Sequence, residues 1–232
     1  MKRLGIIGAM EEEIALLKEK IDISKTEEMA GMVFYTGTMR DNEIILVKSG
    51  IGKVNAAVCT QILIDKYNVE AIINTGVAGG IAADVNIGDI VISSDTMQHD
   101  VDATGFGYKL GEIPRMETST FKADEKLIDL AKKASEKVNK NLKVFVERIV
   151  SGDQFISNVE KKNMILEVFN GYCTEMEGAA IAQVSYLNQV PFVVIRAISD
   201  KADDSAEINF NEFVLKAAEH SSNMIELIVD EI

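Results

Sequence analysis

Short apolar runs and amphipathic runs alternate along most of the chain. The strand-like runs are apolar or β-branched, and they are Arg3–Gly8, Met32–Met39, Glu43–Lys48, Ala71–Thr75, Asp89–Ser93, Val144–Ser151 and Pro191–Ile198. The helix-like runs space apolar residues three or four positions apart, and they are Glu11–Ile21, Val54–Tyr67, Asp124–Val138, Val159–Phe169, Met176–Leu187 and Asn211–Val229. This alternation predicts helices on both faces of a largely parallel or mixed sheet, and hence a three-layer α/β fold with a central twisted sheet.

The length and composition predict one domain over residues 1–232, since no linker-like or repeated segment interrupts the chain. The net charge of −13 argues against binding to nucleic acid or an anionic membrane, which requires clustered Lys and Arg. Two cysteines without a CxxC pattern and only two histidines predict no metal site and a reduced, cytoplasmic protein. The first apolar run meets three glutamates too early to predict a signal peptide, and no apolar run reaches the roughly 20 residues of a membrane helix.

Polar side chains follow several predicted strands, at the points where those strands end. The segments are GAMEEE (Gly8–Glu13), TGVAGG (Thr75–Gly80), SGDQFI (Ser151–Ile156) and RAISDKADD (Arg196–Asp204). Open α/β sheets bind ligands beyond the carboxyl ends of their strands. Together with TEMEGAA (Thr174–Ala180), these segments predict an apolar cleft ringed by carboxylates, one arginine and an aromatic ring. Such a cleft suits a neutral, aromatic ligand that carries hydroxyl groups.

Each polar feature also has a purely structural explanation. Acidic residues such as Glu11–Glu13 are favoured in the first turn of a helix by its macrodipole. The Gly-rich helix entry Ser49–Ala57 could bind a phosphate group, but the pattern GxxxxGK[ST] is absent. His99 and His220 have no nucleophile or acid nearby in sequence, and Asp200 could simply cap the segment that follows it. Only the combination of several strand ends favours a ligand site.

The longest irregular segment, Asp100–Thr120, contains Phe106, Tyr108 and Pro114 together with three glycines. Loops of this length in compact domains are usually lids or interface segments, or else they are disordered. Exposed aromatic side chains are unfavourable in a loop that only contacts water, so we expect this segment to contact a ligand or a partner.

Six motifs, in order, are GIIGAMEEEI, KSGIGKVNAA, NTGVAGG, VSGDQFI, TEMEGAAIA and RAISDKAD. In order and spacing they resemble the 5′-methylthioadenosine/S-adenosylhomocysteine nucleosidase family over nearly the whole chain. The resemblance implies a nucleoside phosphorylase-like fold, a homodimer and no cofactor. It also implies irreversible hydrolysis of the adenine–ribose bond, which gives adenine plus 5-methylthioribose or S-ribosylhomocysteine.

The resemblance assigns catalytic roles to four residues. Asp200 would be the general acid that protonates adenine N7, and Ser199 would hold its side chain. Glu13 would orient and activate the attacking water, with Arg196 nearby to steady it. One carboxyl group acting as an acid while another activates water is the division of labour of inverting glycosidases.

The same resemblance implies contacts to the adenosine half of the substrate. Glu177 would hold the ribose hydroxyls, and Met176 would pack against the sugar. Phe155 would stack on adenine, while the backbone of Ile156 would read the edge of the base. Gly79 would let the main chain approach the base closely.

The 5′-alkylthio group would lie in an apolar pocket formed by Met10, Ile51 and Phe210. The resemblance further implies that Phe106 and Pro114, on the long loop, reach this pocket from the partner subunit of the dimer. Because the predicted walls are apolar and open-ended, we expect 5′-methylthioadenosine, S-adenosylhomocysteine and 5′-deoxyadenosine all to be accepted.

The chain departs from the family pattern at Val77, where some members have a serine that contacts the water site. Valine cannot donate or accept a hydrogen bond, so this role would pass to the backbone or to solvent.

Two other functions stay open: a purine nucleoside phosphorylase and a non-catalytic purine-binding protein. Related phosphorylases have Gly and Arg after the first strand to bind phosphate, whereas the three carboxylates of GAMEEE would repel it.

Overall fold

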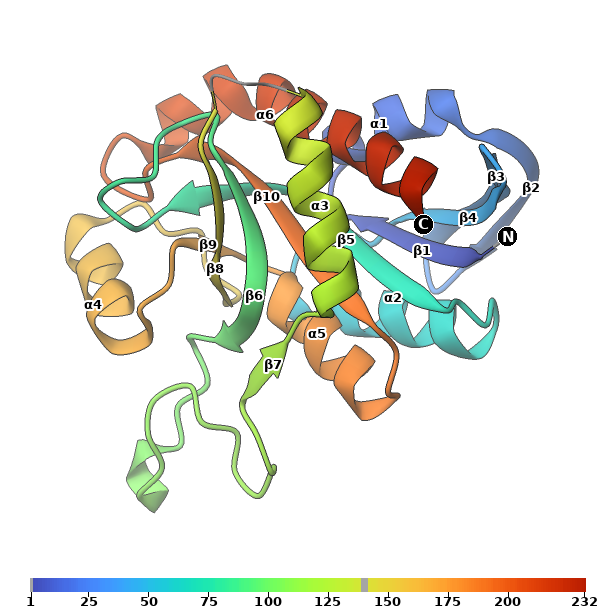
Figure 1. The fold of residues 1–232 in the computed structure, drawn as a ribbon. Helices are drawn as coiled ribbons and strands as arrows, with labels where there is room; N and C mark the ends of the chain where they lie inside the picture. Colours follow the sequence, from blue (N-terminus) through green and yellow to red (C-terminus); the bar gives the residue numbers. More distant parts are fainter. Residues whose placement is uncertain (1, 139–141) are drawn as a thin grey trace.

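The computed structural model describes residues 2–138 and 142–232. Ten strands form one mixed sheet in the order β10-β6-β8-β9-β5-β1-β4-β3-β2, with β7 paired to β6 (Figure 1). The strands are β1 (Arg3–Gly8), β2 (Asp22–Met29), β3 (Met32–Met39), β4 (Asn42–Lys48), β5 (Ala71–Gly80), β6 (Ile90–Gln98), β7 (Thr120–Lys122), β8 (Val144–Ser151), β9 (Cys173–Glu175) and β10 (Phe192–Asp200). The helices are α1 (Glu11–Lys20), α2 (Lys53–Asp65), α3 (Glu125–Val138), α4 (Val159–Phe169), α5 (Gly178–Leu187) and α6 (Ala206–Glu231).

Helices cover the sheet from two sides, as the alternating pattern predicted. The long helix α6 packs against α1, α3, β5 and β10 on one side, and α2 packs against α5 on the other (Figure 1). The prediction of a mixed α/β sheet with helices on both faces is therefore confirmed. Within the described residues, no helix is both long and apolar enough to cross a membrane.

The sheet closes on itself at one end because β10 pairs with both β5 and β6. In the same region β9 connects β5 to β8, and β8 pairs with β6. Every residue of β5 is buried, including the glycines of TGVAGG. We expected this strand to end at Thr75, but it continues to Gly80 because strands on both sides pair with its backbone. The closure brings the carboxyl ends of β1, β5, β8 and β10 together.

Three strands were missed by the apolar pattern. β2 has the sequence DISKTEEM and lies at the edge of the sheet, where most of its side chains are exposed or half-buried. A polar edge strand of this kind discourages pairing with other chains, and it lacks the apolar signal of an interior strand. β7 and β9 have only three residues each, too short for a periodic pattern.

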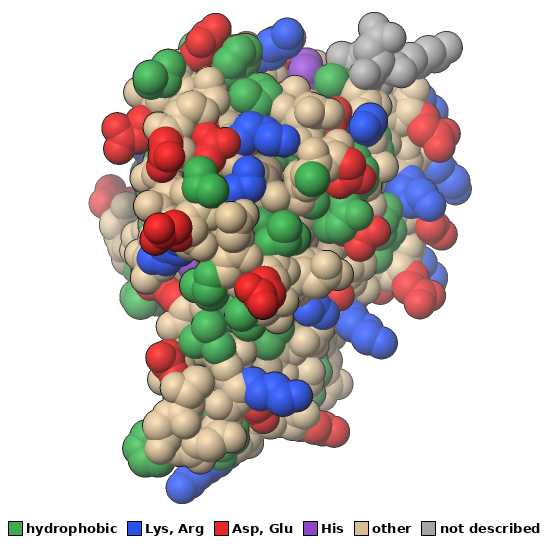
Figure 2. Space-filling model, turned by 90° about the vertical axis from the view of Figure 1, so that its left-hand side faces the viewer, with side chains coloured by type: hydrophobic (Ala, Val, Ile, Leu, Met, Phe, Trp, Pro, Cys, Tyr) green, Lys and Arg blue, Asp and Glu red, His purple; other side chains and the backbone are tan. Residues whose placement is uncertain are grey.

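The segment 101–119, between β6 and β7, projects from the body of the protein as an arm (Figures 1 and 2). Its only regular element is the short 3-10 helix η1 (Thr104–Phe106). The side chain of Phe106 is 87% exposed, and Pro114 is exposed as well. The arm therefore presents apolar side chains to solvent in the isolated chain, which agrees with the expectation that it contacts something else.

Candidate active site

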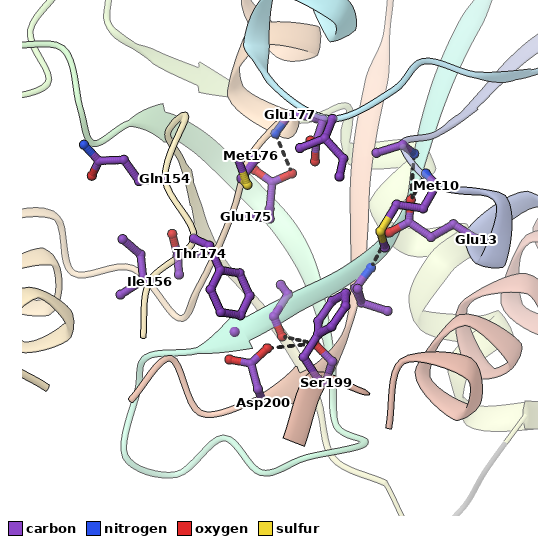
Figure 3. Close-up of a pocket in the computed structure, with 17 residues that line it drawn as sticks. Met10, Glu13, Gln154, Ile156, Thr174, Glu175, Met176, Glu177, Ser199 and Asp200 are labelled. Atoms are coloured by element: carbon purple, nitrogen blue, oxygen red, sulfur yellow. Dashed lines mark hydrogen bonds between the residues drawn. The ribbon is translucent and has the colours of Figure 1, made fainter. Parts of the chain in front are cut away.

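A cavity lies at the carboxyl ends of β1, β5, β8 and β10 and encloses about 600 Å³, including solvent at its mouth (Figure 3). The lining residues come from the four strand ends and from TEMEGAA, together with Ile51 and Phe210. All but three of the predicted site residues line the cavity; the three that do not are Arg196, Phe106 and Pro114. The prediction that these strand ends meet at one site is therefore confirmed, while the role of each residue stays a prediction.

Glu13 is the only one of the three consecutive glutamates that enters the cavity; Glu11 and Glu12 are exposed. Glu13 is the third residue of α1, and its carboxylate reaches back to accept from the backbone N–H of Ala9 at 2.6 Å and of Met10 at 3.0 Å. A third N–H, from Val77 in β5, donates to the other oxygen at 3.0 Å. Three donors fix the orientation of this carboxylate.

Burial raises the pKa of Glu13, while the nearby positive charge of Arg196 and the three backbone N–H groups act in the opposite direction. The group therefore has a higher affinity for a proton than an exposed glutamate, yet it has donors arranged to stabilise its ionised form. This combination is typical of a general base that works near neutral pH.

Two glycines of β5 make room for carboxylates. A Cβ atom on Gly76 would lie 2.3 Å from Oε1 of Glu13, and one on Gly79 would lie 2.8 Å from Oδ1 of Asp200. Any side chain at either position would displace a carboxylate. Gly79 also lines the cavity, so its expected closeness to a bound base stays a prediction; its closeness to Asp200 was not foreseen.

Asp200 ends β10 on a different side of the cavity from Glu13 (Figure 3). The hydroxyl of Ser199 donates to Oδ2 of Asp200 at 2.9 Å, and the backbone N–H of Ala202 donates to Oδ1 at 2.8 Å. Burial raises the pKa of Asp200 and outweighs these two hydrogen bonds, which act to lower it. The carboxyl group thus retains its proton to a higher pH than an exposed aspartate.

Glu177 immediately precedes α5 and accepts from the backbone N–H of Gly52 at 2.8 Å. Burial raises its pKa, and the adjacent Glu175 carboxylate raises it further; the charge of Arg196 and the Gly52 hydrogen bond act in the other direction. In the absence of a ligand this carboxylate has few donors for its charge. Hydroxyl groups of a bound sugar would supply the missing donors.

The ion-pair partner of Arg196 is Glu175. Its guanidinium group donates to Glu175 and to Asn74 Oδ1, and the Arg196 and Glu175 side chains are only 2% and 3% exposed. Glu175, on β9, lies beside Arg196 because β9 joins the closed end of the sheet. The role of Arg196 in steadying Glu13 stays a prediction. Arg196 influences Glu13 only through its charge.

Glu175 lines the cavity and has a structural role that the sequence did not reveal. Besides Arg196, its carboxylate accepts from Ser151 and from the backbone N–H groups of Glu177 at 3.2 Å and Gly178 at 2.8 Å. It therefore stabilises the N-terminus of α5 and fixes the backbone of Glu177. The sequence signal was present, as two glutamates flank Met176 in TEMEGAA, but nothing in it showed which glutamate is structural.

One wall of the cavity is aromatic and apolar. Phe155 and Phe210 meet edge to face, with ring centroids 5.9 Å apart, and Phe155 remains about half exposed toward the cavity mouth. Ile156 is buried beneath, in a small cluster with Phe169 of α4. A flat base could stack against such a wall. Gln154 and Thr174 also line the cavity and were not predicted.

Such a fold and such a cavity are those of a nucleoside-cleaving α/β protein, and the model of the Phosphorylase superfamily matches residues 3–231. A protein of Bacillus cereus (strain G9842), 5′-methylthioadenosine/S-adenosylhomocysteine nucleosidase, is 46% identical over 231 residues, which cover 99% of both chains. The chain accordingly belongs to the 5′-methylthioadenosine/S-adenosylhomocysteine nucleosidase family, as its motifs suggested, and is an N-glycosyl hydrolase by family.

Solved structures support this placement. The nucleosidase of Neisseria meningitidis, in complex with methylthio-immucillin-A, is 41% identical and superimposes with a TM-score of 0.96, with both chains fully covered. A futalosine hydrolase of Helicobacter pylori is 35% identical with a TM-score of 0.94, covering 100% of this chain and 98% of that one. The two proteins share one architecture although their names refer to different substrates.

Proposed function

We propose that the protein hydrolyses the N-glycosidic bond of 5′-methylthioadenosine and S-adenosylhomocysteine, with 5′-deoxyadenosine as a further substrate. The products are adenine and 5-methylthioribose or S-ribosylhomocysteine, which places the reaction in methionine salvage. The observation that carries this proposal is the pair Glu13 and Asp200, two buried carboxyl groups with raised pKa on different sides of one cavity. A base on one side and an acid on the other are what N-glycoside hydrolysis requires.

Asp200 acts as the acid. Breaking the glycosidic bond moves negative charge onto the purine, and a proton delivered to N7 lets adenine leave as a neutral molecule. The raised pKa of Asp200 keeps the carboxyl protonated in a larger fraction of molecules near neutral pH. Ser199 and the Ala202 N–H then stabilise the carboxylate that remains after the transfer.

Glu13 acts on the water. Its carboxylate is fixed by three backbone N–H groups, and one of them comes from Val77, the position where the family pattern is broken. Valine contributes through its N–H and not through its side chain, so the serine hydroxyl of other members is not needed to hold Glu13. The attacking water is held by Glu13 itself and by solvent.

The charges around the sugar favour a cationic transition state. Glu13, Glu175 and Glu177 lie close enough to Arg196 to raise the pKa of its guanidinium group, against the effect of burial. Glu13 and Glu175 together outweigh the one guanidinium, and Glu177 adds further negative charge when it is ionised. Positive charge develops on the ribose as the bond breaks, and fixed negative groups stabilise it.

Phosphorolysis is disfavoured by the same arrangement. The Gly-rich entry to α2 could have bound phosphate, but its N–H groups at Gly52 and Lys53 already bind the carboxylates of Glu177 and Asp153. A dianion in the cavity would also meet three carboxylates.

The deciding experiment measures adenine release from 5′-methylthioadenosine with and without phosphate. Equal rates support hydrolysis, a requirement for phosphate supports a phosphorylase, and no release supports a purine-binding protein.

Glu177→Gln is expected to weaken substrate binding by about tenfold, because an amide only partly replaces a carboxylate that accepts from two hydroxyl groups. Turnover should fall by a larger factor, since the carboxylate also stabilises the cationic ribose. Steady-state kinetics on the riboside and its 2′-deoxy analogue test this role. Identical kinetics of the wild-type protein on both substrates would contradict a role of Glu177 at the ribose.

The active unit is proposed to be a homodimer in which the arm of one subunit completes the pocket of the other. Phe106 and Pro114 are exposed at the arm, and Val54 and Val58 expose apolar side chains on α2, near Ile51 at the cavity. Exposed apolar side chains that gather on one surface often mark an interface. In a two-fold symmetric dimer both pockets would be completed in the same way.

Phe106→Ala is therefore expected to weaken the binding of 5′-alkylthio nucleosides by about 1–3 kcal/mol, the value of a partly buried aromatic contact. Adenosine, which lacks the alkylthio group, should be affected less. Binding of both ligands and sedimentation at the assay concentration test the model. A fully active monomer, or equal losses for both ligands, would overturn it.

A second candidate activity is hydrolysis of futalosine, suggested by the futalosine hydrolase of Helicobacter pylori among the structural neighbours. Ile51, at the proposed 5′ end of the cavity, is 53% exposed, so this end is open to a larger substituent. Incubation with futalosine as the only substrate, followed by assay of the released base, distinguishes a broad enzyme from one restricted to thioether nucleosides.

A further inference from the structure

Three residues that do not line the cavity form a closed ring of hydrogen bonds beside it. The ammonium group of Lys53 binds Oδ1 of Asp100 at 2.5 Å. The other oxygen of Asp100 accepts from the backbone N–H of Asp153 at 2.9 Å, and Asp153 Oδ1 accepts from the backbone N–H of Lys53 at 2.8 Å. The ring thus connects the start of α2, the end of β6 and the turn that follows β8.

Gly52 connects the ring to the proposed sugar site. Gly52 precedes Lys53, and its N–H donates to Glu177 Oε1 at 2.8 Å. Gly52 has a φ of +99°, and a Cβ there would lie 3.1 Å from Asp153 Oδ1, so this backbone geometry requires glycine. The Gly52 N–H lies one residue before the Lys53 N–H that Asp153 holds, so the position of Lys53 restrains the direction of the Gly52 N–H.

The ring is well placed to hold this geometry. The side chains of Lys53 and Asp100 are only 18% and 14% exposed, so their ion pair is less screened than a surface pair. Lys53 also donates to Gln98 Oε1 at 2.8 Å, and Gln98 in turn binds Gln183 of α5. Burial acts to raise the pKa of Asp100, but the bonds to Lys53 and to the Asp153 N–H lower it overall.

We propose that Asp100, Lys53 and Asp153 are positioning residues for Glu177, which they orient through the N–H of Gly52. This inference rests on the proposed role of Glu177 at the ribose hydroxyls. The Lys53 branch of the ring leads to Glu177 and the sugar, whereas the Asp153 branch holds the turn that carries Phe155 and Ile156. Asp100 is also the residue from which the arm departs, so the root of the arm is fixed to the sugar site.

Asp100→Asn separates the two branches of the ring. The asparagine carbonyl can still accept from the Asp153 N–H, which leaves the turn that carries Phe155 and Ile156 in place. Its amide group then faces the Lys53 ammonium, and two donors cannot bond to each other. The ion pair is lost while the size of the side chain is unchanged.

The test measures binding by calorimetry in an Asp200→Asn background, so that the nucleoside is not consumed. Adding Asp100→Asn is expected to raise the Kd of 5′-methylthioadenosine by about tenfold, the size of one charge-assisted bond between a misplaced Glu177 and the ribose, and to change the Kd of adenine by less than about twofold. Lys53→Met, which removes the ammonium and keeps the backbone N–H, should give the same selective loss. The double variant should be no weaker than either single variant, because both remove one interaction.

Asp95→Asn is the matched control. Asp95 binds Arg148 at 2.6 Å with 19% and 29% exposure of the two side chains, and neither residue lines the cavity. Asp95→Asn should leave the Kd of 5′-methylthioadenosine and the Kd of adenine unchanged. The inference is overturned if the ring variants leave the Kd of the nucleoside unchanged, or if they raise the Kd of adenine by the same factor. If Asp100→Asn does not fold, Lys53→Met decides the question. If the wild-type chain releases adenine and the ring variants bind normally, the inference alone fails; if the wild-type chain neither cleaves nor binds the nucleoside, the proposed function fails with it.

Discussion

Asp200→Asn is expected to lower kcat by about 10²–10⁴-fold or more while the fold and adenine binding are retained. An amide has no proton of suitable acidity for adenine N7, so the base would have to leave as an anion. The exchange is nearly isosteric: the asparagine carbonyl can accept from Ser199 or from the Ala202 N–H, whose bonds now fix Asp200. The loss should therefore appear in turnover, with the melting temperature close to that of the wild-type protein.

The pH profile gives a second readout of the same residue. The protonated form of Asp200 is the active form, so activity is present below the pKa of Asp200 and is lost as the pH rises through that pKa. Because burial raises this pKa, the alkaline limb of the pH profile moves to higher pH. Glu13 must be ionised, so activity falls at low pH, below a pKa that burial also raises. Asp200→Asn should remove the alkaline limb from the residual activity and leave the acidic limb.

Asp203→Asn is the matched control for Asp200. Asp203 does not line the cavity, and its negative charge helps to raise the pKa of Asp200. Its removal should leave turnover at the optimum unchanged within about threefold and move the alkaline limb to lower pH. Activity of Asp200→Asn within tenfold of the wild-type value would contradict the assignment of the general acid.

The position of the cavity could be predicted from the sequence because it depends on which polar segments directly follow the predicted strands. Polar residues follow the strand ends, and the carboxyl ends of the parallel strands β1, β5 and β10 meet at one edge. The end of β8 joins them through β9, a strand that the sequence did not predict. The identity of the active glutamate could not be predicted from Glu11–Glu13 by composition. Only the third helical residue can turn its carboxylate back toward the strand end, where β5 adds the Val77 N–H from 64 residues away.

The buried partner of Arg196 was unpredictable for a related reason. Arg196 and Glu175 are brought together by β9, a three-residue strand whose pairing with β5 and β8 depends on the closure of the sheet. The edge strand β2 was missed because its sequence is polar, and its position is set by pairing with β3 alone. Both failures concern contacts between segments whose own sequences carry no strong periodic signal.

Glu175→Gln is expected to lower the free energy of unfolding by about 3–5 kcal/mol, because it leaves the buried charge of Arg196 without its ion-pair partner. Glutamine has the same size and can keep one acceptor for the Gly178 N–H, so the cost arises mainly from the lost charge. For a chain of this length, the melting temperature should fall by about 6–20 °C, at roughly 2–4 °C per kcal/mol.

Two comparison variants separate the buried charge from a general effect of losing a glutamate. Glu43→Gln breaks the Arg3–Glu43 pair, whose side chains are 40% and 28% exposed, and should cost no more than about 1 kcal/mol. Adding Arg196→Met to Glu175→Gln removes the unpaired charge and should recover part of the lost stability, since a buried pair can often be replaced by neutral groups at little cost. Equal melting temperatures for Glu175→Gln and Glu43→Gln, or a further loss in the double variant, would show that the Arg196–Glu175 pair does not stabilise the closed end of the sheet.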